Sequence, residues 1–145
     1  MKVLRLDDVE PSRLYGTLWK PIRSTLGIRA FGINAYVAER AGDPLFNEHD
    51  ETEEFAGDQR HEELYFVVTG RAAFTVDGQE LDAPARTFVF VDDPRSRRGA
   101  VAAEADTLIL AIGGPVDEAY RPAPWEDRFL VERRRLTSDR ARPQA

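Results

Sequence analysis

The sequence predicts an all-β domain, a sandwich or barrel of short antiparallel strands. Segments rich in β-branched and aromatic residues follow one another between positions 28 and 112, at intervals of about eight to twelve residues. Asp77 and Gly78 separate two of these segments, and this dipeptide favours a tight hairpin turn because both residues tolerate positive φ. After Gly113, Gly114 and Pro115 the strand pattern stops, so the β domain is expected to end there.

The elements can be placed in order along the chain. Residues 1–27 are expected to form an N-terminal arm, with a short edge strand at 3–6 and an irregular stretch with one helical turn at 10–27, where two prolines and a glycine occur. Residues 28–115 are expected to form the barrel, with strands at 28–38, 63–69, 72–76, 80–83, 87–91, 100–103 and 107–112. Residues 116–145 are expected to be a C-terminal extension, with a helical turn at 116–120, a short helix at 125–136 and a frayed end.

Strand alternation also predicts which side chains share a face. Tyr65 and Val67 lie on the same face as Glu63 if that strand is regular. Further side chains are expected in the core or in a pocket: Phe74, Val76, Phe88, Phe90, Leu108 and Leu110. A pocket with mostly apolar walls and few polar groups suits a small organic molecule.

Composition excludes several classes of protein. The formal net charge is −6 and the pI is about 5.0, which argues against a nucleic-acid or membrane-surface binder, because both need a broad basic face. The chain has no cysteine, so disulfides, thiolate zinc sites and cysteine nucleophiles are excluded. Neither a secretory signal nor an apolar run long enough to span a membrane is present. We therefore expect a cytoplasmic protein.

One acidic stretch carries both histidines of the chain. Nine acidic residues and one basic residue lie between positions 43 and 63, together with His49 and His61. Each histidine is followed two positions later by a glutamate, Glu51 and Glu63, and residues two apart on a strand face the same side. Two imidazoles and two carboxylates form a suitable ligand set for a divalent metal. The alternative is a solvated acidic loop or an interaction surface.

Two segments resemble the motifs of the cupin superfamily. Glu63 and Gly70 are separated by six residues, as in the second half of the first cupin motif, and residues 83–91 resemble the approach to the second motif. The chain is similar to small single-domain bacterial cupins of the cupin-2 conserved barrel type. This resemblance implies a double-stranded β-helix, or jelly-roll barrel, with short N- and C-terminal extensions around one internal small-molecule pocket.

The resemblance also implies a metal site, from which this sequence departs. Cupins usually hold a divalent metal through two histidines and a glutamate of the first motif and one histidine of the second. Aligned without a gap, the first-motif histidine positions fall on Ala56 and Asp58. With residues 52–60 as an insertion, which we prefer, the resemblance implies one ion of Fe, Mn, Ni or Zn on the set His49, Glu51, His61 and Glu63.

The second motif departs further. Arg86 replaces the usual glycine, and the histidine position falls on Ser96, Arg97 or Arg98, none of which is a ligand for a first-row metal. A metal-free site is therefore a second hypothesis. In it Arg97 or Arg98 pairs with Glu63, or binds a carboxylate or phosphate of the ligand, beside Tyr65. The alternative for both arginines is a solvated turn.

Three functions follow as hypotheses. The first is a metal-dependent enzyme of oxygenase, isomerase or cyclase type, the second a metal-free ligand-binding or sensing module. The third is an interaction scaffold that uses the acidic loop or the basic tail, which includes residues 133–135. The resemblance also implies a homodimer, and Trp19 and Trp125 lie outside the motifs, where they are expected to cap the barrel or contact a second subunit.

Overall fold

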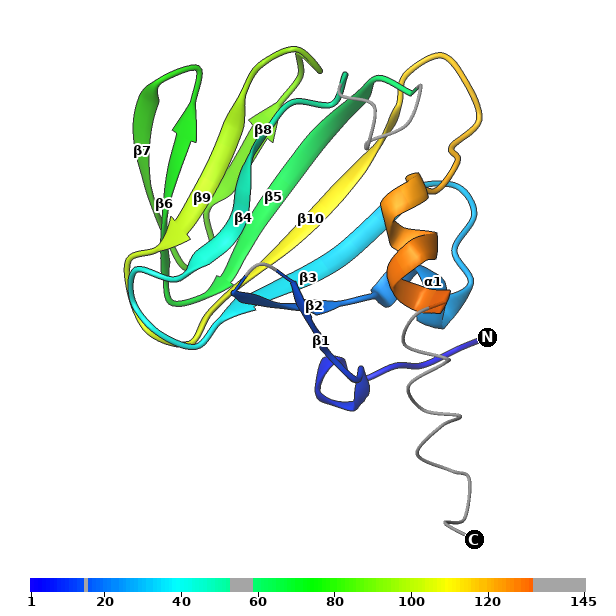
Figure 1. Ribbon diagram of the computed structural model, residues 1–145, viewed down its shortest axis with the longest axis horizontal. Coiled ribbons are helices and arrows are strands. Elements are labelled where there is room, and N and C mark those ends of the chain that lie inside the picture. Colours follow the sequence, from blue (N-terminus) through cyan, green and yellow to red (C-terminus); the bar gives the residue numbers. More distant parts are fainter. Residues whose placement is uncertain (15, 53–58, 132–145) are drawn as a thin grey trace, which may run out of the picture.

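The computed structural model describes residues 1–14, 16–52 and 59–131, and folds them into two antiparallel sheets whose inner faces pack together (Figure 1). One sheet has six strands in the order β1-β2-β3-β10-β5-β8, and the other has four in the order β4-β9-β6-β7. This two-sheet arrangement confirms the predicted all-β class. In the described part of the chain no helix is long and apolar enough to cross a membrane.

Ten strands and three short helical segments make up the described chain. The strands are β1 (Ser12–Leu14), β2 (Thr17–Lys20), β3 (Gly32–Ala38), β4 (Pro44–His49), β5 (His61–Thr69), β6 (Arg71–Val76), β7 (Gln79–Pro84), β8 (Phe88–Val91), β9 (Arg98–Ala102) and β10 (Thr107–Pro115). The helical segments are a 3₁₀ turn, η1 (Leu6–Asp8), the helix α1 (Ile22–Leu26), and residues 124–131, which lie beside α1 (Figure 1).

The predicted hairpin is confirmed. β6 and β7 pair antiparallel from Arg71↔Pro84 to Val76↔Gln79. Asp77 and Gly78 close the turn with φ of 48° and 78°. Arg86 also has a positive φ, 72°, which is the conformation that a glycine normally provides. The Arg86 backbone therefore adopts the conformation that the glycine of the resembled motif would provide.

The core lies between the sheets and contains side chains from both. Its buried members are Ala38, Leu45, Tyr65, Val67, Ala72, Phe74, Ala83, Val91, Ala100, Ala102 and Ile109. The prediction for Phe88 and Phe90 was wrong, because 63% and 56% of these residues are exposed. Alternation along β8 turns Val91 inward and both phenylalanines outward, where Phe88 stacks on Phe66 at 4.4 Å between ring centroids.

The N-terminal arm is more ordered than predicted. Residues 3–6 form no strand; the chain instead enters η1, where the carbonyl of Leu6 accepts a hydrogen bond from Lys20 Nζ at 2.9 Å. The edge that such a strand would need is occupied by β1, which pairs with β2. The stretch 10–27, predicted as irregular, contains this pair, because Gly16 adopts a φ of 93° and lets the chain reverse.

The C-terminal extension is held against the barrel. Residues 116–120 bend and form no helical turn, because the side chain of Gln59 satisfies this backbone. Its Nε2 donates to the carbonyl of Ala119 at 2.7 Å, and its Oε1 accepts from the amide of Arg121 at 2.5 Å. A helix follows at 124–131, as predicted. The remainder of the predicted helix, the tail, its arginines and the acidic residues 53–58 lie outside the described residues.

Candidate functional site

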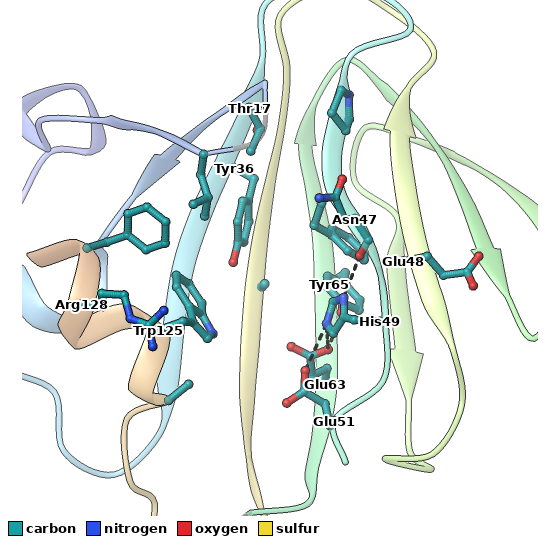
Figure 2. A pocket seen from close by; sticks show the side chains of 16 residues that line it. Thr17, Tyr36, Asn47, Glu48, His49, Glu51, Glu63, Tyr65, Trp125 and Arg128 are labelled. Atoms are coloured by element: carbon teal, nitrogen blue, oxygen red, sulfur yellow. Dashed lines mark hydrogen bonds and ion pairs between the residues drawn. The ribbon is translucent and has the colours of Figure 1, made fainter. Parts of the chain in front are cut away.

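A cavity of about 440 Å³ lies between the sheets. β4 contributes Phe46, Asn47 and His49, and β3, β5 and β10 contribute Tyr36, Glu63, Tyr65 and Ala111. The arm and the helix at 124–131 complete the wall with Leu14, Thr17, Trp125, Arg128 and Phe129. Figure 2 shows His49, Glu51, Glu63 and Tyr65 gathered on one side of this space, with Trp125 and Arg128 on the other.

His49 is the last residue of β4 and has a fixed orientation. Its Nδ1 lies 2.8 Å from the backbone oxygen of Asn47, and its Nε2 lies 3.1 Å from Oε1 of Glu51 and 3.9 Å from Oε2 of Glu63. A carbonyl oxygen can only accept a hydrogen bond, so Nδ1 carries a proton. Nε2 faces carboxylate oxygens, which also only accept when ionised. A proton or another cation must therefore lie between Nε2 and Glu51.

The electrostatics agree with a shared proton at this position. Burial lowers the pKa of His49, but the hydrogen bonds to Glu51 and to the Asn47 carbonyl, together with the charge of Glu63, outweigh it and leave the pKa raised. The backbone amide of Glu51 donates to the carbonyl of Pro94 at 2.8 Å, which fixes the turn that brings this carboxylate to the histidine.

Glu63 lies in an environment that disfavours its charge. Burial, and then the neighbouring charge of Glu51, raise the pKa of Glu63 to about 7, against the lowering effect of His49, Tyr65 and Arg98. The Tyr65 hydroxyl donates a hydrogen bond to Oε2 of Glu63. Burial also raises the pKa of Tyr65 well above its ordinary value, so this hydroxyl keeps its proton at neutral pH. Its ring stacks on Phe46, 4.8 Å between centroids.

Arg98 is the charged partner of this group. It is fully buried, and its Nε lies 3.5 Å from Oε2 of Glu63. Strand pairing places it directly opposite His49, because β4 and β9 match these two residues in register. Its Nη1 donates to the carbonyl of Pro94 at 3.3 Å, whereas Nε and Nη2 have no hydrogen-bond partner among the residues that the structure describes. A buried guanidinium with unsatisfied N–H groups is unusual, and points toward a ligand or a proton acceptor nearby.

Comparison with known proteins identifies the architecture. No protein-family model matches the chain, and no curated protein matches it by sequence. Solved structures do match. A predicted oxalate decarboxylase from Thermotoga maritima has a TM-score of 0.64 at 14% identity, over 79% of this chain and 100% of its own. An RmlC-like cupin from Shewanella frigidimarina has a TM-score of 0.56 at 18% identity, over 77% and 88%. This chain has the cupin fold.

A third neighbour is Pac13 from Streptomyces, described as a nucleoside dehydratase. Its TM-score is 0.57 at 14% identity, and the match covers 88% of this chain and 97% of Pac13. At these identities the likeness concerns the fold.

Three of the four predicted metal ligands come together. One ligand atom each from His49, Glu51 and Glu63 lies within 4.8 Å of the others. Imidazole nitrogen and carboxylate oxygen are suitable donors for Mn, Fe, Ni or Zn, so the set fits a divalent ion in kind and spacing. Arg98 is the feature that disagrees, because a buried positive charge beside Glu63 opposes a second cation.

The fourth predicted ligand, His61, lies behind this group. It starts β5, and its ring packs against Tyr120 at 5.5 Å between centroids. Its Nδ1 is 3.6 Å from Oε2 of Glu51, and its Nε2 is 3.5 Å from the side-chain oxygen of Gln59. Burial lowers the pKa of His61. His61 thus contacts the far oxygen of Glu51, a supporting position, and does not line the cavity.

The two arginines predicted as alternatives separate clearly. Arg98 points inward, whereas the side chain of Arg97 is 49% exposed, with Nε 2.9 Å from Oε1 of Glu48 and Nη1 3.8 Å from Oδ2 of Asp50. Arg98 is the first residue of β9 and pairs with Glu63, whereas Arg97 precedes that strand. Of the residues in the ligand-binding hypothesis, Tyr65 lines the cavity, and Arg98 reaches it through Glu63.

On one wall of the cavity Trp125, expected to cap the barrel or contact a second subunit, lies against Trp19, whereas Arg128 and Phe129 were not predicted as lining residues. Trp125, Arg128 and Phe129 lie on one face of the helix at 124–131 because they are three and four residues apart. This spacing was the available signal, but the side of the barrel that the helix covers depends on tertiary contacts. Trp125 packs edge-on against the buried Trp19, at 5.3 Å between ring centroids.

Proposed function

We propose that this cupin is an enzyme that moves protons on a small organic molecule held in the barrel, in an isomerisation or in the elimination of water. One observation carries the proposal: Nε2 of His49 faces the cavity 3.1 Å from the Glu51 carboxylate, while its Nδ1 is fixed by the Asn47 carbonyl. A histidine oriented by a second acceptor and coupled to a carboxylate has the arrangement of a general acid–base pair.

The residues divide the work according to their environments. His49 and Glu51 share a proton, and the Glu51 carboxylate can accept a second proton from a carbon of the substrate and return it. Glu63, with a pKa of about 7, is partly protonated at neutral pH and can donate to a departing or rearranging oxygen. Tyr65 and Arg98 orient this carboxyl group and stabilise its charged form. Pac13, a dehydratase, is an example of a cupin-like barrel associated with a reaction of this class.

A metal-dependent version is the second candidate, favoured by the spacing of three donor atoms. His49, Glu51 and Glu63 would hold a divalent ion, which would act as a Lewis acid on a substrate oxygen. In that case Nε2 of His49 and the carboxylates would be occupied by the metal, and Tyr65 with Arg98 would remain to orient Glu63.

The experiment is an activity screen with matched variants. Wild type, His49→Gln, Glu51→Gln and Arg97→Gln are incubated with a metabolite extract in deuterium oxide, and products are followed by mass spectrometry. Loss of water or uptake of deuterium is expected for wild type and for Arg97→Gln, and not for the two site variants. Equal turnover by His49→Gln, or no conversion by wild type, contradicts the proposal.

Metal analysis separates the two candidates. The same protein is assayed after dialysis against a chelator and after addition of Mn, Fe, Ni or Zn. Activity that survives the chelator supports the acid–base enzyme. Activity that depends on one added ion, with about one ion bound per chain, supports the metal-dependent version.

We also propose a homodimer formed through the outer face of the six-stranded sheet. Phe88 and Phe90 are exposed on β8, which ends this sheet, and Leu64, Phe66 and Ile112 are partly exposed beside them. A second copy offers the same apolar face and the same strand edge. Two antiparallel strand edges related by a twofold axis are self-complementary. A second copy therefore covers the apolar face and pairs with the open edge of β8 at the same time.

A further inference from the structure

The cavity has a cation at the end opposite the acid–base group. Arg128 lines it from the helix at 124–131, across from His49 and Glu63 (Figure 2). Most acidic and basic side chains around the barrel have an opposite charge within reach, as Arg97 has Glu48 and Arg71 has Asp82. Arg128 forms no hydrogen bond or ion pair with any residue that the structure describes.

The helix that carries Arg128 is firmly anchored. The buried carboxylate of Glu126 accepts from Arg23 Nε of α1 at 2.8 Å and from Asn34 Nδ2 of β3 at 3.0 Å. Trp125 and Phe129, which flank Arg128 on the cavity face, contact Trp19 at 5.3 Å and 6.4 Å between ring centroids. The helix that carries Arg128 is therefore held at the cavity by buried contacts of its neighbouring residues, and the Arg128 side chain itself is exposed.

The walls between the two ends are aromatic. Tyr36 and Phe46 lie 6.4 Å apart between ring centroids, and Trp125 and Phe129 face them from the helix side. Aromatic side chains bind flat, unsaturated rings by stacking and edge contacts. A guanidinium binds carboxylate and phosphate groups through paired N–H donors. The volume of about 440 Å³ falls within the usual range for a small-molecule site.

We propose that the substrate is a small planar organic anion whose carboxylate or phosphate pairs with Arg128 while its ring lies between the aromatic walls and its other end reaches His49. This proposal rests on the proposed function, because it names the substrate class of the same cavity. It assigns binding to Arg128 and Trp125, and leaves proton transfer to the opposite end.

Binding of defined probes tests the proposal without a known substrate. Dissociation constants are measured by calorimetry for benzoate, phenyl phosphate, neutral benzamide and the non-planar cyclohexanecarboxylate. We expect benzoate or phenyl phosphate to bind at least about tenfold more tightly than benzamide, because a charge-assisted contact contributes roughly that factor. Benzoate is expected to bind more tightly than cyclohexanecarboxylate. Whichever of benzoate and phenyl phosphate binds more tightly indicates whether the substrate carries a carboxylate or a phosphate.

The variants assign the effect. Arg128→Gln is expected to remove the preference for anions, whereas Arg121→Gln, an exposed arginine paired with Glu118 outside the cavity, is expected to keep it. An anion preference that survives in Arg128→Gln, equal affinity for benzoate and benzamide, or no saturable binding of any probe overturns the proposal.

His49→Gln separates this inference from the proposed function. The variant is expected to bind benzoate or phenyl phosphate with the anion preference intact, because His49 lies at the other end of the cavity (Figure 2). Anion binding through Arg128 without any turnover would mean that the enzymatic proposal alone had failed. Turnover with a KM that Arg128→Gln leaves unchanged would mean that the substrate class alone was wrong.

Discussion

The Nε atom of Arg98 lies 3.5 Å from Oε2 of Glu63, and the arginine has no exposed surface. This pair compensates part of the negative charge that Glu51 and Glu63 bring together. Several properties of the protein should depend on it.

Replacing Arg98 should destabilise the fold in a pH-dependent way. Arg98→Met leaves the Glu63 carboxylate buried without its cation, and removal of one partner from a buried pair costs about 3 kcal/mol. The loss is expected above the pKa of Glu63, about 7, and should shrink at lower pH, where the carboxyl group is neutral. Urea unfolding of wild type and Arg98→Met above and below pH 7 measures this loss.

The adjacent residue provides the control for this substitution. Arg97→Met removes an exposed pair with Glu48, which is expected to change the free energy of unfolding by less than about 0.5 kcal/mol. A similar loss in both variants, or a loss for Arg98→Met that is independent of pH, would contradict the role given to the Arg98–Glu63 pair.

A histidine at position 98 should create metal affinity. Arg98→His removes the buried cation and adds an imidazole opposite His49 in the β4–β9 register, beside the carboxylates of Glu51 and Glu63. We expect its affinity for Ni or Zn to exceed that of wild type by at least about tenfold, a gain of roughly 1.4 kcal/mol. Titration with each ion by calorimetry measures the change. Arg98→Met controls for loss of the charge alone, and wild-type affinity as high as that of Arg98→His would favour the metal-dependent enzyme.

The carboxyl group of Glu63 should leave a signature in stability against pH. Its pKa is about 7 in the folded chain and 4.5 ordinarily, so between these values the folded protein holds a proton that the unfolded chain has released. Its contribution to stability is therefore present at low pH and is lost as pH rises from 4.5 through 7, by about 3 kcal/mol.

Comparison with Glu63→Gln isolates this contribution. His49, with a raised pKa, changes stability in the same direction, and His61, with a lowered pKa, acts in the opposite one. Subtracting the stability-against-pH profile of Glu63→Gln from that of wild type removes much of the contributions of His49 and His61. We expect Glu63→Gln to gain stability relative to wild type between about pH 5 and about pH 8. Parallel profiles would show that Glu63 titrates normally.

Much of the cluster formed by His49, Glu51 and Glu63 could be predicted from the sequence, because its signals are local. The gap between Glu63 and Gly70 fixes one strand, and the two-residue spacing of His49 and Glu51 places them on one side. His61 obeys the same spacing relative to Glu63, yet its ring packs toward Tyr120. The segment that covers it comes from far along the chain, which no local pattern describes.

The prediction of which side chains face the core was wrong where both faces of a strand are apolar. In β8 phenylalanine alternates with valine, so periodicity alone cannot tell which set faces the core. Arg128 escaped notice for a related reason. Its helix was expected, but the surface that the helix covers is determined by the buried contacts of Glu126 with Arg23 and Asn34.

The anchor of that helix should be essential for the cavity wall. Glu126→Gln leaves Arg23, whose side chain is only 9% exposed, without its charged partner, at a cost of about 3 kcal/mol. We expect a lower melting temperature and weaker binding of the anionic probes. Asp127→Asn, an exposed neighbour on the same helix, is the matched control and should change neither. Wild-type stability of Glu126→Gln would show that the helix does not depend on this pair.

The outer face of the six-stranded sheet should control the oligomeric state. Phe90→Ser removes an aromatic ring that is 56% exposed on the edge strand β8, and the apolar area it contributes to a dimer is lost. Light scattering after gel filtration is expected to give a dimer for wild type and a monomer, or a dissociation constant raised at least about tenfold, for this variant. Leu81→Ser, on the edge strand β7 of the other sheet and 41% exposed, should remain dimeric. A monomeric wild type would show that this dimer does not form. Equal dissociation of both variants would place the dimer contact elsewhere, since a specific interface must distinguish the two edges.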